Sequence, residues 1–194
     1  LLASSAASDV YKRQAIGYIK KTVIGDVMNI KKVRVDKEGT GMGWGAVYAQ
    51  YLESMDQIGE QGNGLSVSRQ LYKGDEALNE SAPLKVGDKI TVRLTVKADR
   101  DMDFVQIKDD RAACMEPLQA VSGFRWSNGL GYYQATKDAS TQFFIDQMRK
   151  GTYVIEYQVY VNRTGEYQAG IATVQSAYAP EFGGHTGGYR VMVE

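Results

Sequence analysis

The stretch that decides the fold is Lys89-Ile-Thr-Val-Arg-Leu-Thr-Val-Lys97. Its apolar residues alternate with polar ones, and successive side chains of an extended strand point to opposite faces. This alternation predicts a strand with one buried face and one face in contact with solvent.

The rest of the C-terminal region repeats this pattern in short runs separated by turn residues. Short strands at this spacing are typical of an antiparallel β-sandwich with immunoglobulin-like architecture, which we predict for residues 63–194. Residues 112–121 are expected to cross between sheets, and residues 178–188 to form a long loop. The further expected strands are 65–72, 104–108, 131–136, 141–146, 153–161, 167–175 and 189–193.

The N-terminal region has fewer strand patterns. Residues 18–24 and 29–35 are expected to form a hairpin, and residues 44–51 a third strand. Three strands are too few to enclose a core, so residues 15–56 are predicted to be part of a truncated β domain. The Ser/Ala-rich residues 1–14 resemble a translated sequencing or cloning scar and are left out of this prediction.

Composition excludes several classes of function. The 194 residues include 13 Tyr, 21 Gly and 3 Pro, which favours an all-β chain. Lys plus Arg and Asp plus Glu number 23 each, so the chain has no net field that would attract nucleic acid or anionic lipid. No apolar run is long enough for a membrane helix. We therefore expect neither a nucleic-acid partner nor insertion into a membrane.

The acidic turn at residues 99–103 has the alternating Asp spacing of a calcium loop. An EF-hand also needs a glycine at its sixth position, where this chain has Phe104, and helices on either side. We therefore expect a solvated turn whose acids pair with Arg100 and Arg111, and no metal site.

No catalytic set stands out. Glu116 with Asp109 or Asp110 could form an acid/base pair, but no cleft signature accompanies them. His185 lies between glycines and is interpreted as a loop residue, and Cys114, the single cysteine, as a small apolar filler. We expect neither an enzyme nor a bound cofactor.

A series of short motifs runs through the C-terminal region in a fixed order. They are Val86-Gly-Asp88, Asp99-Arg-Asp-Met-Asp-Phe-Val105, Asp110-Arg-Ala-Ala113, Glu116-Pro117, Ser122-Gly-Phe-Arg-Trp126, Tyr132-Tyr133, Phe143-Phe144, Gly151-Thr-Tyr-Val-Ile-Glu-Tyr157, Gly165-Glu-Tyr-Gln-Ala-Gly170 and Tyr178-Ala-Pro-Glu-Phe182. Together they resemble the C-terminal macroglobulin domain of the bacterial alpha-2-macroglobulin family. The long loops and Trp44-Gly-Ala-Val-Tyr48 are similar to its Bacteroidetes-like members in particular.

This resemblance implies a broad-range protease inhibitor of the periplasm or cell envelope that traps target proteases through an internal thioester. This chain has no Cys-x-Glu-Gln motif, so the reactive group is expected in another domain of the parent chain. The resemblance implies that the loop with Ala177, Tyr178, Pro180 and Glu181 packs on that thioester domain and shields the bond from water.

The alternative is a free-standing carbohydrate- or protein-binding module. A carbohydrate-binding module would expose two or three coplanar aromatic rings on one face. The inhibitor domain would instead bury Trp126, Tyr153 and Tyr157 and carry Tyr178 at the edge of a loop.

Overall fold

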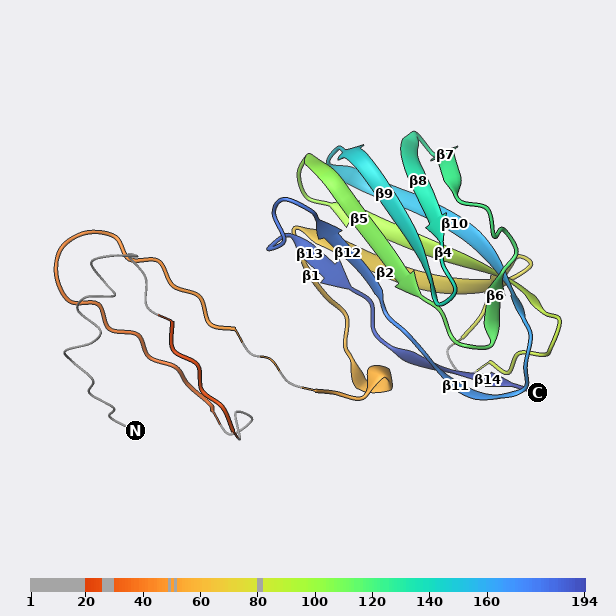
Figure 1. Cartoon of the computed structure of the whole chain (residues 1–194), viewed down its shortest axis with the longest axis horizontal. Coiled ribbons are helices and arrows are strands. Elements are labelled where there is room, and N and C mark those ends of the chain that lie inside the picture. The colour runs from red at the N-terminus through yellow and green to blue at the C-terminus, as the bar shows by residue number, and fades with distance from the viewer. Residues whose placement is uncertain (1–19, 26–29, 49, 51, 80–81) are drawn as a thin grey trace. The chain divides into compact units, whose positions relative to one another are not determined.

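The computed structural model describes residues 20–25, 30–48, 50, 52–79 and 82–194 (Figure 1). The chain divides into two units, Leu1–Tyr51 and Leu52–Glu194.

The described residues of the first unit contain no strand, so the expected hairpin and third strand are wrong over those residues. A strand is stable when it has a hydrogen-bonded neighbour and a face to bury. Here Val35 is 81% exposed and Trp44 is 91% exposed, so neither side chain is buried. The remaining parts of these predicted strands, and residues 1–14, lie outside the described residues. The assignment of residues 15–56 to a partial β domain stays a prediction.

The second unit is a two-layer antiparallel β-sandwich, as predicted (Figure 1). The first layer contains β6 (Met115–Pro117), β10 (Gly151–Val161), β4 (Lys89–Ala98) and β2 (Leu65–Lys73), with β3 (Glu76–Ala77) paired to β2. The second layer contains β12 (Ala172–Ser176), β5 (Met102–Asp110), β9 (Ser140–Met148), β8 (Leu130–Thr136) and β7 (Gly123–Ser127).

Two short strands, β1 (Gln61–Asn63) and β13 (Gly183–His185), pair with each other and connect β2 to β12. Hydrogen bonding is therefore continuous from one layer to the other. The remaining elements are a small sheet of β11 (Gly165–Ala169) and β14 (Tyr189–Val193), and a 3-10 helix, η2 (Met55–Gln57).

The core lies between the two layers. Strand β4 buries alternate residues from Ile90 to Val96, as its sequence predicts, and its neighbours are β2 and β10. Phe143 of β9 is fully buried, and its ring centroid lies 5.6 Å from that of Tyr132 and 5.9 Å from that of Tyr157. Because each buried apolar Å² contributes about 25 cal/mol, this shared interior stabilises both layers at once.

Two strand predictions are wrong in detail. Residues 167–175 form two strands, β11 and β12, which belong to different sheets. The predicted loop contains β13, where glycine allows close backbone approach. A Cβ added at Gly184 would lie 2.7 Å from the carbonyl oxygens of Gln61 and Leu65. The sequence shows only a glycine-rich segment, because the partner strand is far away in the chain.

The expected burial of aromatic residues holds only in part. Tyr157 is buried and Tyr153 is half-buried, but Trp126 is 77% exposed. Trp126 lies on β7 at the end of the strand order, and its ring lies over Gly131 on the outer face of the sheet. An edge strand leaves such a ring uncovered, so the predicted burial of Trp126 is wrong.

Candidate functional site

The candidate site is the loop between β12 and β13, residues 177–182. Its backbone is fixed at both ends. The amide of Ala177 donates to the carbonyl of Phe104 at 2.9 Å, and the amide of Ser176 donates to the carbonyl of Phe182 at 3.0 Å. A third bond, from the Phe182 amide to the Ala179 carbonyl at 2.9 Å, closes the turn. The loop therefore holds its side chains in a defined position.

Two side chains from neighbouring strands also bind the backbone of this loop. Gln175 Nε2 donates to the carbonyl of Pro180 at 3.2 Å, and Asn63 Nδ2 donates to the carbonyl of Glu181 at 2.7 Å. The loop thus contacts both strands that flank β13, and its carbonyl groups are partly satisfied by side chains.

Tyr178 is the most exposed aromatic residue of the loop, at 80%. Its ring meets Phe104 edge-on, with 5.2 Å between centroids and an interplanar angle of 84°. Phe104 itself has a φ of 53°, in the left-handed region that bulky residues rarely adopt, and is 49% exposed. The structure thus places Tyr178 at the edge of a loop, as expected, with its ring packed against the ring of Phe104. Its role in shielding stays a prediction.

The acidic turn pairs with arginine only in part. Arg100 Nε donates to Asp99 Oδ1 at 2.8 Å, and this hydrogen bond lowers the pKa of Asp99. Arg111 does not pair with an acid. It donates to the hydroxyl of Thr141 at 2.6 Å and to the carbonyls of Lys137 and Asp138, so that part of the expectation is wrong. Within the described residues, no three His, Cys, Asp or Glu side chains are grouped to hold a metal.

Glu116 does not form an acid/base pair with Asp109 or Asp110, because each of these side chains has another partner. Asp109 is 1% exposed, and both of its oxygens are engaged, with Arg69 Nη1 at 2.5 Å and the Tyr157 hydroxyl at 2.7 Å. Glu116 instead accepts a hydrogen bond from Asn162 Nδ2 at 3.2 Å, and Asp110 accepts one from Lys108 Nζ at 2.9 Å. Burial, followed by the Asp109 carboxylate, raises the pKa of Tyr157 well above its usual value, so the hydroxyl stays protonated and donates.

Cys114 and His185, the single cysteine and the single histidine, both lie within the packed or hydrogen-bonded part of the sandwich. Cys114 is fully buried, and burial raises the pKa of its thiol, which keeps it unreactive. His185 is a strand residue of β13 rather than a loop residue, and it pairs with Gln61 and Thr173. The expectation of a loop histidine is therefore wrong.

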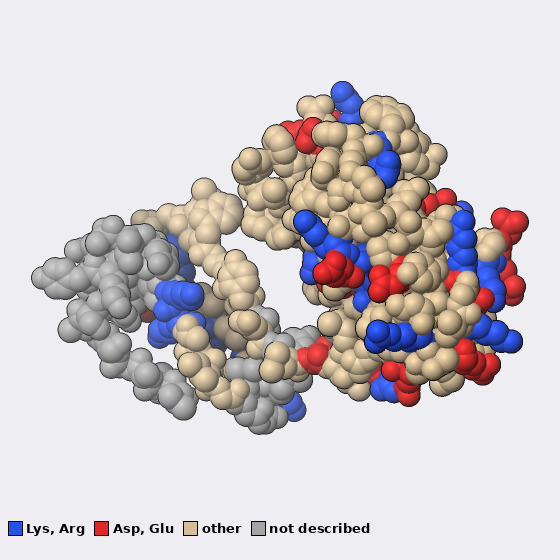
Figure 2. Space-filling model, turned by 45° about the vertical axis from the view of Figure 1, so that its right-hand side comes forward, with Lys and Arg blue, Asp and Glu red and all other residues tan. Residues whose placement is uncertain are grey.

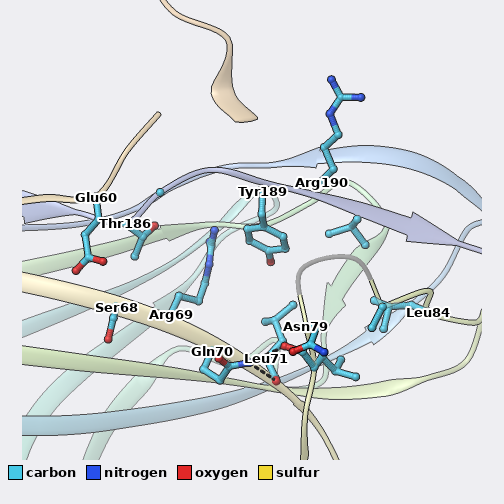
Figure 3. A pocket seen from close by; sticks show the side chains of 14 residues that line it. Glu60, Ser68, Arg69, Gln70, Leu71, Asn79, Leu84, Thr186, Tyr189 and Arg190 are labelled. Atoms are coloured by element: carbon cyan, nitrogen blue, oxygen red, sulfur yellow. Dashed lines mark hydrogen bonds between the residues drawn. The ribbon is translucent and has the colours of Figure 1, made fainter. Parts of the chain in front are cut away.

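A small cavity of about 180 Å³ lies beside Arg69, and Figure 3 shows the guanidinium of Arg69 next to the ring of Tyr189. The two groups are 4.5 Å apart, and Arg69 also donates to the carbonyl of Gly170 at 2.6 Å. Burial lowers the pKa of Arg69, but the Asp109 carboxylate together with Tyr189 and Tyr157 raises it, and the net shift is upward, so the guanidinium stays charged. Glu60 is the single carboxylate among the lining residues. The lining comprises Glu60, Ser68, Arg69, Gln70, Leu71, Leu78, Asn79, Ala82, Leu84, Thr186, Gly187, Tyr189, Arg190 and Val191.

The buried carboxylate of Asp109 connects Arg69 and Tyr157, and we call these three residues the Arg69–Asp109–Tyr157 network. This network is the main feature that the sequence prediction missed. Leu65 and Val67 are buried, and the period of two places Arg69 on the same inward face of β2. An arginine at an inward strand position in the sequence would have indicated such a network, since a buried charge requires a counter-charge elsewhere in the core. Which residue supplies that charge is not visible in the sequence.

On the face of the second unit shown in Figure 2, Lys and Arg are interspersed with Asp and Glu. This agrees with the formal net charge of zero. Of the described residues, none belongs to a helix that is long and apolar enough to cross a membrane.

The two-layer antiparallel sandwich, closed by β1 and β13 and carrying an exposed tyrosine loop, defines a macroglobulin-type β domain. The family model of the bacterial alpha-2-macroglobulin MG10 domain matches residues 64–181, more than half of the chain. The chain therefore belongs to the bacterial alpha-2-macroglobulin MG10 family, as the sequence motifs predicted.

Solved structures share this fold. Escherichia coli alpha-2-macroglobulin activated by porcine elastase superposes with a TM-score of 0.61 at 16% identity, over 71% of this chain and 14% of that protein. Salmonella alpha-2-macroglobulin reacted with methylamine gives 0.58 at 20% identity, over 70% and 10% of the two chains. At these identities the likeness shows the fold alone.

A curated relative extends the match in sequence. Circularly permutated Ras protein 2 of Dictyostelium discoideum is 28% identical over 166 residues, which cover 82% of this chain and 4% of that protein. The chain thus spans only a small part of each of these larger proteins.

Proposed function

We propose that this chain is the C-terminal structural domain of a bacterial alpha-2-macroglobulin-like inhibitor of endopeptidases. In this role the domain is not catalytic. It packs on the thioester domain of the same parent chain, and it meets target proteases only through the whole protein. From the family membership we infer that the parent acts in the periplasm or cell envelope.

The observation that carries the proposal is the exposed ring of Tyr178 on a fixed loop. A ring that is 80% exposed but held by a hydrogen-bonded turn is suited to cover a partner surface. A thioester hydrolyses unless water is kept from it, and an apolar ring with one polar tip can exclude that water. Ala177 and Pro180 add small apolar neighbours, while Glu181 remains at the solvent side of the loop.

The proposal is tested by replacing Tyr178 in the full-length parent protein. We expect Tyr178→Ala to release the thioester cysteine faster in buffer without protease, because the shielding ring is lost. Tyr178→Phe should stay close to wild type, because it keeps the ring. The rate of thiol appearance with a chromogenic disulfide reagent measures this. Tyr160→Ala is the matched control, since Tyr160 is an exposed tyrosine of β10. Equal rates for Tyr178→Ala, Tyr160→Ala and wild type would contradict the shielding role.

A binding module is the second candidate, and one observation favours it. Phe124 and Trp126 are 79% and 77% exposed on the same edge strand. The ring planes of Phe124 and Tyr133, however, are inclined by 75°, which does not form the flat platform that stacking on a sugar requires. The exposed rings therefore favour a protein ligand over a glycan.

A further inference from the structure

The outer face of the second layer carries two rows of residues across four strands. The pairings Phe124↔Tyr133, Tyr133↔Phe144 and Phe144↔Gln106 form the first row, from β7 through β8 and β9 to β5. In that row Phe124 and Phe144 are exposed. Exposed aromatic rings gathered on one sheet face mark an interaction surface.

The second row is centred on Asp146. The pairing Trp126↔Gly131 joins β7 to β8, and continuing the β8–β9 register by two residues places Gly131 beside Asp146. On the other side, Asp103↔Gln147 and Val105↔Ile145 place Phe104 beside Asp146. Asp146 therefore lies between the positions of Trp126 and Phe104, two residues along β9 from Phe144.

Gly131 brings the indole of Trp126 close to this carboxylate. A Cβ at Gly131 would lie 2.8 Å from two ring carbons of Trp126, so the ring occupies the space that a side chain would otherwise fill. The indole thus lies over β8 at Gly131. Trp126 and Asp146 are separated only by a residue without a side chain.

These residues line an open cleft with a volume of about 1180 Å³. Six of the lining residues are aromatic, and two acids and two arginines are the charged ones. The lining comprises Asp103, Phe104, Phe124, Arg125, Trp126, Gly129, Leu130, Gly131, Tyr132, Phe144, Asp146, Gln147, Arg149 and Tyr153.

The two acids of this cleft are not paired with its two arginines. Arg125 Nη2 is engaged by Gln119 Oε1 at 3.3 Å and the carbonyl of Val121 at 3.4 Å, and Arg149 pairs with Asp101 at 3.8 Å. Among the described residues, neither the Asp103 carboxylate nor the Asp146 carboxylate has an ion-pair partner. The cleft therefore presents free carboxylates among aromatic rings, a combination that attracts a cation through both the charge and the ring faces.

We propose that this cleft binds a lysine or arginine side chain of a partner polypeptide. The ammonium or guanidinium group lies against Asp146 and over the ring of Trp126, while the aliphatic stem of the same side chain contacts Phe104 and Phe144. A basic side chain satisfies both features at once, because it carries an apolar stem and a cationic end. The proposal does not rest on the shielding role of Tyr178, although the ring of Phe104 both lines the cleft and contacts Tyr178.

The test is a nuclear magnetic resonance titration of the labelled full chain with a short capped peptide that contains one lysine in a Gly/Ala background. The readouts are the Trp126 indole signal, identified with Trp126→Phe, and the backbone amides of β7 to β9. We expect saturable shifts with a dissociation constant in the millimolar range, as suits one exposed cation site. Asp146→Asn should weaken binding about fivefold to tenfold, and added salt should weaken it further. Asp75→Asn, which removes an exposed acid from the β2–β3 turn, is the matched control and should bind as wild type does.

Three outcomes would overturn the proposal. The first is equal binding of a matched peptide in which norleucine replaces the lysine, which would make the cleft simply apolar. The second is an Asp146→Asn variant that binds as well as wild type. The third is the absence of shifts at about 20 mM peptide; shifts with an oligosaccharide in that case would indicate a glycan site. The titration reports on the cleft, whereas the thiol-release assay reports on the thioester, so the two proposals fail separately.

Discussion

Replacing Asp109 with asparagine is the sharpest test of what holds the two layers together. Asp109 on β5 connects Arg69 on β2 with Tyr157 on β10, so it links the second layer to two strands of the first. The Arg69 and Asp109 side chains are 4% and 1% exposed, so water cannot replace the lost charge. The amide introduced by Asp109→Asn would still accept a hydrogen bond from Tyr157, but it would leave the guanidinium buried without a counter-charge.

The magnitude follows from that burial. Removing one partner of a buried ion pair costs about 3–5 kcal/mol, because the remaining charge is uncompensated in a medium of low dielectric. Domains of this size have a free energy of unfolding of about 5–15 kcal/mol, so the loss is a large share of the total. We expect a marked fall in the midpoint of urea unfolding of the Asp109→Asn variant, followed by circular dichroism.

Two companion variants make this measurement interpretable. Glu156→Gln removes an acid from the exposed Arg93–Glu156 pair, whose side chains are 41% and 44% exposed, and should cost at most about 1 kcal/mol. The triple variant Arg69→Met, Asp109→Leu and Tyr157→Phe removes both charges and the hydroxyl that donates to Asp109, and it should recover much of the lost stability. If Asp109→Asn costs no more than Glu156→Gln, the reasoning about the buried network is refuted.

Two further predictions concern acid stability and the N-terminal boundary. Three exposed or half-exposed pairs lower the pKa of an aspartate below the ordinary 3.8 through a hydrogen bond: Arg190 to Asp56, Lys73 to Asp88 and Arg100 to Asp99. The stability that these pairs contribute is therefore present above pH 3.8 and is lost as the pH falls through the lowered pKa values. The urea midpoint should therefore be flat from about pH 7 to pH 5 and fall below about pH 4; a midpoint that is unchanged down to about pH 2.5 would contradict this. Residues 63–194 should unfold cooperatively without residues 1–55. They should unfold at a lower temperature than residues 52–194, because the shorter chain lacks two contacts: the Asp56–Arg190 pair at 2.9 Å and the hydrogen bond from the Gly188 amide to the Ile58 carbonyl at 3.1 Å. Calorimetry measures both truncations, and a non-cooperative transition for residues 63–194 would refute the predicted boundary.

Local patterns predicted most of the strands of the sandwich. The alternation in β4, and in β10 from Ile155 to Val161, lies within each strand, so recognising it needs no knowledge of the partner strand. The turn at Asn128 and Gly129, with φ of 52° and 78°, is similarly local, because an Asn-Gly pair tolerates the left-handed conformation. Where the pattern was short or rich in glycine, as in β13, the prediction was wrong.

The candidate loop was predicted for a different reason. Tyr178 stands beside a proline that ends a strand, and the motif around it matches a family, so its position at a loop edge could be expected. The support from Phe104 could not, because it depends on a left-handed residue 74 positions earlier in the chain.

By itself, the sequence determined the class of the fold, the order of most strands and the family, because strand periodicity, turn residues and motif order are properties of neighbouring residues. Only the tertiary structure decided which charges meet in the core, which ring faces solvent and where a cleft forms. Arg69 and Asp109 are 40 residues apart in the chain, and the exposure of Trp126 depends on β7 lying at a sheet edge. Such features arise from pairings between distant strands, and no local pattern encodes them.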